Sequence, residues 1–189
     1  MLVPKRTKGL HELAGSGDDG STGLLGGGRT GKDDLRIETY GTVDEASSAL
    51  GLAKALSSEP RVKEIVERLQ QGLYRVGAEL ATNPRSTARF VTTTAEEVGA
   101  LDSLMAELES EAPMPSGFVL PGTTPASAAL DLARAVVRRA ERRCVALARE
   151  GGVDNQQVQR YLNRMGLLLF VLARFEEARE GASARPAKQ

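Results

Sequence analysis

Residues 124–149, TPASAALDLARAVVRRAERRCVALAR, decide the fold class of this chain. Thr124 is a good N-cap and Pro125 suits the first helical position, so a helix is predicted to start here. At about 100° per residue, its apolar side chains share one side and predict a face packed on a core. These side chains are Ala129, Ala133, Val136, Val137, Ala140, Cys144 and Leu147.

The opposite side of this helix carries a stripe of arginines. Arg134, Arg138 and Arg142 recur at intervals of four residues, and Asp131 and Glu141 flank them. Guanidinium groups stacked on a rigid helix can bind several phosphate oxygens at once. The alternative interpretation is a solvated charged face, because such faces are common on helices.

Residues 161–174, YLNRMGLLLFVLAR, indicate a second apolar helix. We expect Asp154 to cap it, with Gln157 completing a capping box. Asn163 lies on the apolar stripe, one turn before Leu167. An amide in such a place needs a hydrogen-bond partner, which is either a neighbouring helix or a ligand.

The composition excludes several classes of protein. The 189 residues, 41% of them hydrophobic, suit one compact domain, and 25 basic residues balance 25 acidic ones. This balance gives no case for nucleic acid or membrane binding and favours a discrete anionic ligand for the arginine stripe. A single cysteine, Cys144, and a single histidine, His11, exclude a disulfide framework and a cysteine- or histidine-rich metal site. No apolar run approaches the ~20 residues of a membrane span, so we expect a cytoplasmic protein.

Five amphipathic segments with short connections predict an all-α, five-helix bundle. The domain is expected over residues 35–181, after a flexible Gly-rich arm (1–34) and before a disordered tail (182–189). The helices are expected from Thr42 (in a capping box with Glu45), from Pro60 to about Asn83, from Thr94 (capped with Glu97), over the arginine segment, and over about 155–179.

The arm contains GGGRTGK at residues 26–32, which nearly has the spacing of a phosphate-binding P-loop. Asp33 stands where Ser or Thr should hold Mg²⁺, and no hydrophobic strand precedes the motif, so we reject the P-loop. The hydroxyls of Ser21 and Thr22, the cation of Lys32 and many unhindered amides still suit a polyphosphate. A flexible linker is the alternative.

Five segments together resemble the PduO-type ATP:cob(I)alamin adenosyltransferases, in order from about residue 17 to 175. They are GDDGSTGLLGGGR, KDDLRIETYGTVDEASSALG, FVLPG, TPASAALDLARAVVRRAERR and YLNR. The resemblance implies a five-helix bundle that forms a homotrimer with active sites between subunits. It implies transfer of the 5′-deoxyadenosyl group of ATP to cob(I)alamin with Mg²⁺, giving adenosylcobalamin and tripolyphosphate. An adenosylcobalamin-dependent acceptor enzyme would then be a further partner.

The resemblance also implies roles for individual residues. Asp44 would pair with Arg134 across the subunit interface, and Phe118 would press on the lower face of the corrinoid. Arg138, Arg142 and Asn163 would carry catalysis. The residues implied to bind ATP are Ser16, Gly17, Thr22 and Lys32 of the arm, and Arg138, Arg139, Glu141, Arg142 and Asn163 of the bundle.

Three places depart from the pattern of the family. Residues 14–17 (AGSG) stand where the family has Thr-(Arg/Lys)-Thr-Gly, and Thr123 replaces a common glycine. Gly166 and Leu167 replace Ser-Asp, and the apolar run that begins at Leu167 favours a buried, locally repacked site there. A catalytically weakened relative that carries or senses ATP or adenosylcobalamin is therefore the alternative function, with a plain helical scaffold third.

Overall fold

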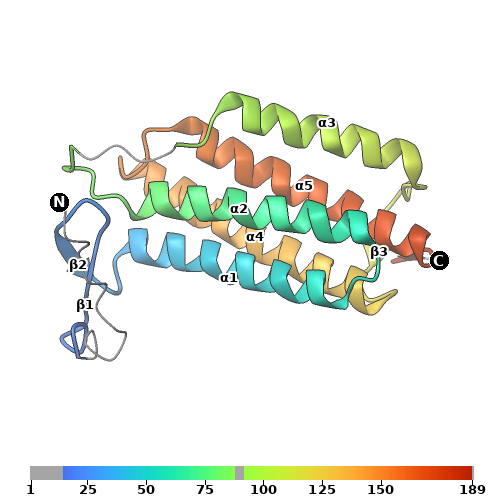
Figure 1. The fold of residues 1–189 in the computed structure, drawn as a ribbon, viewed down its shortest axis with the longest axis horizontal. Helices are drawn as coiled ribbons and strands as arrows, with labels where there is room; N and C mark the ends of the chain where they lie inside the picture. The colour runs from blue at the N-terminus through green and yellow to red at the C-terminus, as the bar shows by residue number, and fades with distance from the viewer. Residues whose placement is uncertain (1–14, 88–91, 189) are drawn as a thin grey trace, which may run out of the picture.

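The computed structural model describes residues 15–87 and 92–188, and five long helices run up and down along one axis (Figure 1). The all-α bundle predicted from the sequence is confirmed. The helices are α1 (Leu35–Leu56), α2 (Pro60–Ala81), α3 (Ala95–Glu111), α4 (Pro125–Arg149) and α5 (Gln156–Arg179).

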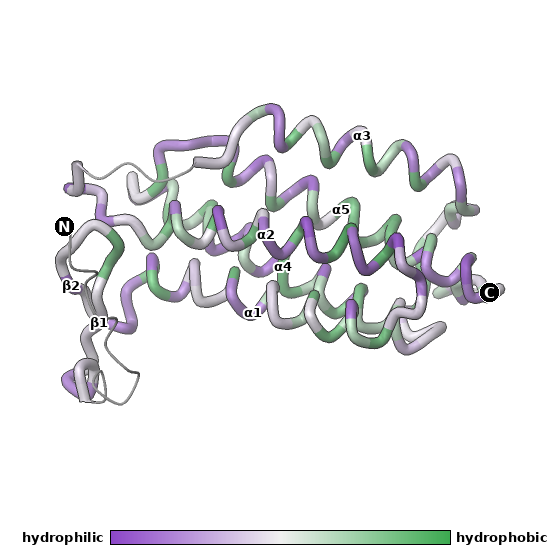
Figure 2. The backbone as a smooth tube through the Cα atoms, viewed as in Figure 1, coloured by the Kyte–Doolittle hydropathy of each residue, from purple (hydrophilic) through white to green (hydrophobic). Residues whose placement is uncertain are grey.

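Helix α1 packs against α2 and α4, α4 packs against α5, and α3 covers the outer side of α5 (Figure 1). Hydrophobic and hydrophilic residues alternate along each helix, as amphipathic helices require (Figure 2). Leu50, Leu69, Val137 and Leu169 come from four different helices and are at most 2% exposed. The apolar face predicted for the arginine helix thus faces a core shared by the bundle.

Most of the predicted helix starts are confirmed. Pro60 opens α2, Thr94 forms a capping box with Glu97 at α3, and Thr124 caps α4. The cap of α5 is Asn155, so the prediction of Asp154 was wrong. Asn155 Oδ1 accepts a hydrogen bond from the backbone N–H of Gln157 at 3.0 Å, which satisfies one of the free amides at the helix start.

The first helix begins at Leu35, so the start predicted at Thr42 was also wrong. Asp34 is the cap, and its side chain accepts from the N–H of Arg36 at 2.8 Å. Thr42 lies inside the helix, where its hydroxyl donates to the carbonyl of Glu38 at 2.7 Å. This internal bond satisfies the hydroxyl, so a residue that is typical of a cap is tolerated within the helix.

Gly72 on α2 allows a close approach between α2 and α5. The hydroxyl end of Tyr161 on α5 occupies the space that a Cβ at Gly72 would need. Burial raises the pKa of Tyr161 to about 12, so the phenol stays neutral at physiological pH. The contact fixes the seam between the two helices.

The described part of the arm forms a hairpin rather than the irregular segment that the sequence predicted. Strands β1 (Ser21–Gly23) and β2 (Arg29–Gly31) are antiparallel, with Thr22 opposite Thr30. Gly26, Gly27 and Gly28 connect them with φ of 82°, 96° and 86°, a conformation that favours glycine. The glycines that indicated disorder therefore build the turn, while flexibility of the arm stays a prediction. Residues 1–14, including His11, lie outside the described residues.

A second short sheet involves the tail. Strand β3 (Val119–Leu120) pairs with β4 (Arg185–Pro186), where the sequence predicted disorder. Because each of these strands has only two residues, no alternating pattern in the sequence could indicate them.

Candidate functional site

The arginines of α4 divide into two groups. Arg139 pairs with Glu45, and Arg143 lies 3.3 Å from Glu38, both on α1. By contrast, no ion pair to Arg134, Arg138 or Arg142 occurs within residues 15–87 and 92–188. The guanidinium groups of this stripe are therefore not neutralised by an ion pair within the described residues, which leaves them available to an anionic ligand.

A groove of about 390 Å³ lies along this stripe, lined by Arg138, Glu141, Arg142, Val145 and Arg149. Asn163 on α5 belongs to the same cluster, because its Nδ2 donates to Glu141 Oε1 at 2.8 Å. Its Oδ1 accepts from Arg164 at 2.8 Å. The structure thus brings together Arg138, Glu141, Arg142 and Asn163, whereas Arg139 faces α1.

Gly166 leaves room for the stem of Arg138. A Cβ built at Gly166 would lie 3.3 Å from Cγ of Arg138, which is tighter than most contacts of this kind. The departure at residue 166 therefore lets the arginine lie close against α5, and a larger residue would push its stem outward.

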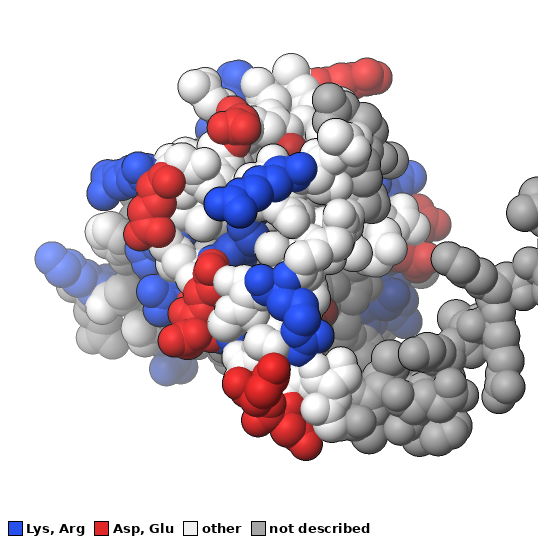
Figure 3. Space-filling view, turned by 90° about the vertical axis from the view of Figure 1, so that its left-hand side faces the viewer, with Lys and Arg blue, Asp and Glu red and all other residues white. Residues whose placement is uncertain are grey.

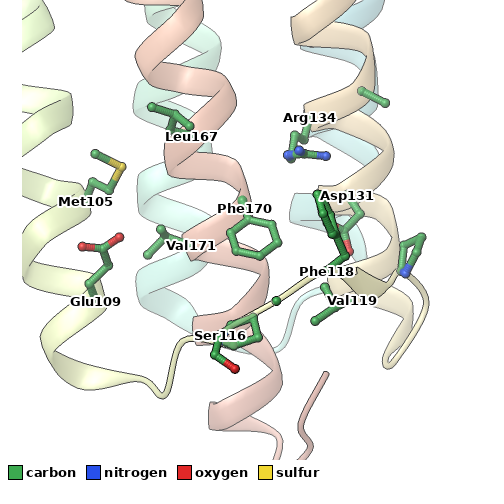
Figure 4. Close-up of a pocket in the computed structure, with 14 residues that line it drawn as sticks. Met105, Glu109, Ser116, Phe118, Val119, Asp131, Arg134, Leu167, Phe170 and Val171 are labelled. Atoms are coloured by element: carbon green, nitrogen blue, oxygen red, sulfur yellow. The ribbon is translucent and has the colours of Figure 1, made fainter. Parts of the chain in front are cut away.

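An apolar cavity of about 820 Å³ lies farther along the same face of α4 and α5 (Figure 4). Phe118, Leu167, Phe170 and Val171 supply its apolar walls. Arg134 also lines it, with its guanidinium 5.7 Å from the ring centroid of Phe170. A basic groove and an apolar cavity therefore lie along one side of the bundle, at successive turns of α4.

Phe118 is the most exposed aromatic residue of the cavity. Its side chain is 91% exposed and lies on the loop between α3 and α4 (Figure 4). Covering such an exposed aromatic ring with a ligand removes apolar surface from water, which favours binding. The contact of Phe118 with a corrinoid stays a prediction.

The arm brings several of its predicted residues together. A Cβ at Gly17 would lie 3.0 Å from Nζ of Lys32 and 3.0 Å from the carbonyl oxygen of Ser21, so the glycine gives the amine room to lie close to this backbone. The sequence analysis missed Arg29, which donates to the carbonyl of Ser16 at 2.5 Å and to Ser21 Oγ at 2.6 Å. Its only signal was its position at the end of the GLLGGGR run.

The hairpin lies at the end of the bundle where α1 begins and α4 ends (Figure 1). Backbone bonds hold it to the end of α2, from Leu25 N to Ala81 O at 3.0 Å and from Asn83 N to Leu25 O at 2.8 Å. Acidic and basic side chains are interspersed on this end of the described molecule (Figure 3). That face therefore lacks the continuous basic surface that is typical of nucleic-acid binding.

Asp44 is exposed on α1. No hydrogen bond or ion pair of its carboxylate is present in the described part of the chain. The pairing of Asp44 with Arg134 across a subunit interface stays a prediction.

Other chemistry has little support in the described residues. Burial raises the pKa of the Cys144 thiol to about 12, so it is not a reactive thiolate. Across residues 15–87 and 92–188 no group of three or more His, Cys, Asp or Glu side chains forms a metal site. The same residues contain no helix that could cross a bilayer.

Residues 13–176 match the sequence profile of the family described as cobalamin adenosyltransferase. The chain belongs to this family. The corrinoid adenosyltransferase of Bacillus subtilis is 41% identical over 171 residues, which cover 88% of this chain and 86% of that protein. The human corrinoid adenosyltransferase MMAB is 39% identical over 173 residues, covering 88% and 68%.

Solved structures of cobalamin adenosyltransferases have the same fold. A variant PduO-type ATP:corrinoid adenosyltransferase from Lactobacillus reuteri, complexed with cobalamin and ATP, gives a TM-score of 0.86 at 30% identity, covering 93% of this chain and 96% of that one. Another variant of it, complexed with ATP, gives 0.85 and covers 93% and 98%.

Leu167 corrects one prediction from the sequence. It is 44% exposed and lines the apolar cavity, so the buried site expected from the apolar run was wrong. The run is explained by Leu168 and Leu169, which point into the core at 0% exposure, while the helical turn directs Leu167 outward.

We therefore expect Leu167→Asp to fold well. An exposed carboxylate keeps its hydration, so thermal unfolding should shift by no more than about 4 °C, as for a change of ~1 kcal/mol. Turnover should equal or exceed that of the wild type, because the substitution restores the residue usual in the family. Leu168→Asp, which buries the charge, is the matched control and should destabilise strongly. Equal destabilisation by both variants would contradict the exposed placement.

Proposed function

We propose that this chain transfers the 5′-deoxyadenosyl group of ATP to cob(I)alamin and releases tripolyphosphate. The observation that carries the proposal is the adjacency of an arginine stripe, which makes no ion pair among the described residues, and a large apolar cavity on one face of α4 and α5. The arginine stripe suits a polyanion, and the apolar cavity suits an extended, largely apolar ring. The product would be adenosylcobalamin for an acceptor enzyme that depends on it.

The chemistry matches the residue types at this face. Reduced cobalt in cob(I)alamin is a strong nucleophile, so attack on C5′ of ATP needs no activating base. The leaving group carries several negative charges, and Arg138 and Arg142 are positioned to stabilise them as they develop. Phe118, at the cavity wall, would exclude water and a lower axial ligand from the corrinoid.

Magnesium fits the groove as a companion of the triphosphate rather than as a resident ion. Mg²⁺ is usually held by one or two carboxylates together with substrate phosphates and water. Glu141 is the carboxylate that lines the groove, and its Oε1 already accepts from Asn163. When bound, the ion would neutralise part of the phosphate charge.

The arm is proposed to bind the triphosphate. Its support is the Lys32 amine beside the backbone of Gly17, with Arg29 holding Ser16 and Ser21 nearby. These groups supply cations, a hydroxyl and accessible amides, all suited to phosphate oxygens. Thr22 lies in the same hairpin, opposite Thr30.

An anaerobic assay tests the function directly. Loss of the cob(I)alamin absorbance on addition of ATP, with release of tripolyphosphate, is the expected result. ATP binding without turnover would instead support a carrier or sensor. If neither ATP nor corrinoid binds in the micromolar range, the chain is a scaffold.

The functional assembly is proposed to be a homotrimer with Asp44 of one subunit paired to Arg134 of the next. Both groups lack an ionic partner in the described chain, and the same two helices expose Leu52 (49%) and Leu132 (53%). A second subunit at this face would cover the exposed leucines and give both charged groups a partner.

Light scattering should give three times the 20.1 kDa of one chain. We expect Asp44→Asn to weaken assembly about tenfold, as for one lost charge-assisted contact. A cycle with Arg134→Gln should show coupling between the two positions. Additive effects of the two substitutions would disprove the pair.

A further inference from the structure

The segment that follows α5 returns to the loop that carries Phe118. Ala182 N donates to the carbonyl of Glu177 at 2.8 Å, so the chain turns as it leaves the helix. It then forms β4, in which Pro186 lies opposite Val119 of β3. Residues 182–188 thus pair with the loop whose Phe118 and Val119 line the apolar cavity.

The contact reaches the backbone of Phe118 itself. Ala187 N donates to the carbonyl of Phe118 at 2.8 Å. Among the described residues, the hydrogen bonds of the loop backbone from 113 to 121 run to residues 185–187. The conformation of the Phe118 loop therefore depends on this segment.

The connection is short and easily opened. Each strand has two residues, both strands are largely exposed, and Pro186 has no N–H to donate. Gly122, at φ 103°, follows β3 and adopts a conformation that favours glycine, so the chain turns directly after the strand. An exposed pair of this size is expected to open on its own without unfolding the bundle.

We propose that residues 182–188 form a strap that positions Phe118 for the corrinoid. The inference rests on the proposed function. The strap holds the loop backbone so that the Phe118 ring stands at the wall of the cavity, and its opening lets a large flat ligand enter and leave. Ala187 is a positioning residue that acts through Phe118, and the ATP groove is independent of it.

The test compares two proline variants of the full chain. Ala187→Pro removes the N–H that donates to Phe118. Lys188→Pro places the same ring one residue later, where no backbone bond is made within the described chain. For Ala187→Pro we expect kcat/KM for corrinoid to fall about fivefold, the usual effect of one lost hydrogen bond, with KM for ATP unchanged within twofold. Cob(II)alamin from which the lower axial ligand is excluded is four-coordinate and has its own absorption spectrum. The fraction of bound cob(II)alamin with this spectrum should be smaller in Ala187→Pro than in the wild type.

Hydrogen exchange at residues 117–121 without substrate gives a readout independent of activity. Exchange should be faster in Ala187→Pro and unchanged in Lys188→Pro. If the wild type lacks turnover, the proposed function fails while exchange and hydroxocobalamin binding still test the strap. Wild-type exchange in Ala187→Pro, or an equal loss of ATP and corrinoid kinetics, would overturn the strap.

Discussion

Replacing Arg138 by alanine is expected to lower kcat/KM for ATP by two to three orders of magnitude while leaving helix content unchanged. Arg138 lines the groove of about 390 Å³ and makes no ion pair within residues 15–87 and 92–188, and its stem lies against Gly166. Loss of one preorganised donor to a developing anion typically costs about 3 kcal/mol of transition-state stabilisation. Steady-state kinetics with cob(I)alamin, and circular dichroism as a check of folding, measure both parts.

Two further variants sharpen this test. Arg143→Ala removes an arginine from the same helix whose charge is already paired with Glu38, so activity should stay within twofold. Arg138→Lys keeps the charge but loses the planar fork and should recover only part of the rate. If Arg138→Ala and Arg143→Ala behave alike, the stripe is a solvated face and the proposed site is wrong.

The sequence predicted the phase of the arginine helix because a 3.6-residue repeat fixes which side chains share a face. Arg138 and Arg142 share a groove, as this repeat requires. The pairing of Arg139 with Glu45 could not be predicted, because it depends on the rotation of α1 against α4. Helical periodicity gives positions on one helix, not the register between two.

The remaining differences have local causes. Asp34 caps α1 within a polar run, where no apolar repeat marked the start of the helix. The hairpin around Gly26–Gly28 needs glycine for its turn, and the same glycines lower any local propensity for structure. Burial of Leu167 was predicted wrongly because it begins an apolar run with Leu168 and Leu169. Each residue turns the helix by about 100°, so Leu167 points to solvent while the next two leucines point into the core.

Replacing Arg174 by methionine is expected to give the largest loss of stability in the bundle. Arg174 is 2% exposed, and its guanidinium lies 2.8 Å from Asp131 and 2.8 Å from Glu177. It also stacks over Phe170, with 5.1 Å to the ring centroid, so the network supports the wall of the apolar cavity. Breaking a buried pair leaves an uncompensated charge, which typically costs 3–5 kcal/mol. The melting temperature should fall by about 10 °C or more.

A matched variant on the same turn of α5 separates this charge effect from a general sensitivity of the site. Glu176 is fully buried and accepts from Ser57 Oγ at 2.9 Å; burial raises the pKa of its carboxyl. Its stabilising contribution is therefore present at low pH and lost as the pH rises through the raised pKa of the folded state. Glu176→Gln keeps an acceptor for Ser57 and removes that loss, so it should be neutral or stabilising near pH 7.

A second substitution is expected to restore part of the stability that Arg174→Met loses. Adding Glu177→Gln removes one of the two carboxylates left without a cation, so the double variant should regain part of the lost stability. Denaturant unfolding of the four proteins gives the coupling, and Asp131 accounts for the stability that is not regained. If Arg174→Met melts within about 3 °C of the wild type, or if Glu177→Gln only adds to its effect, the buried network does not hold α4 and α5 together.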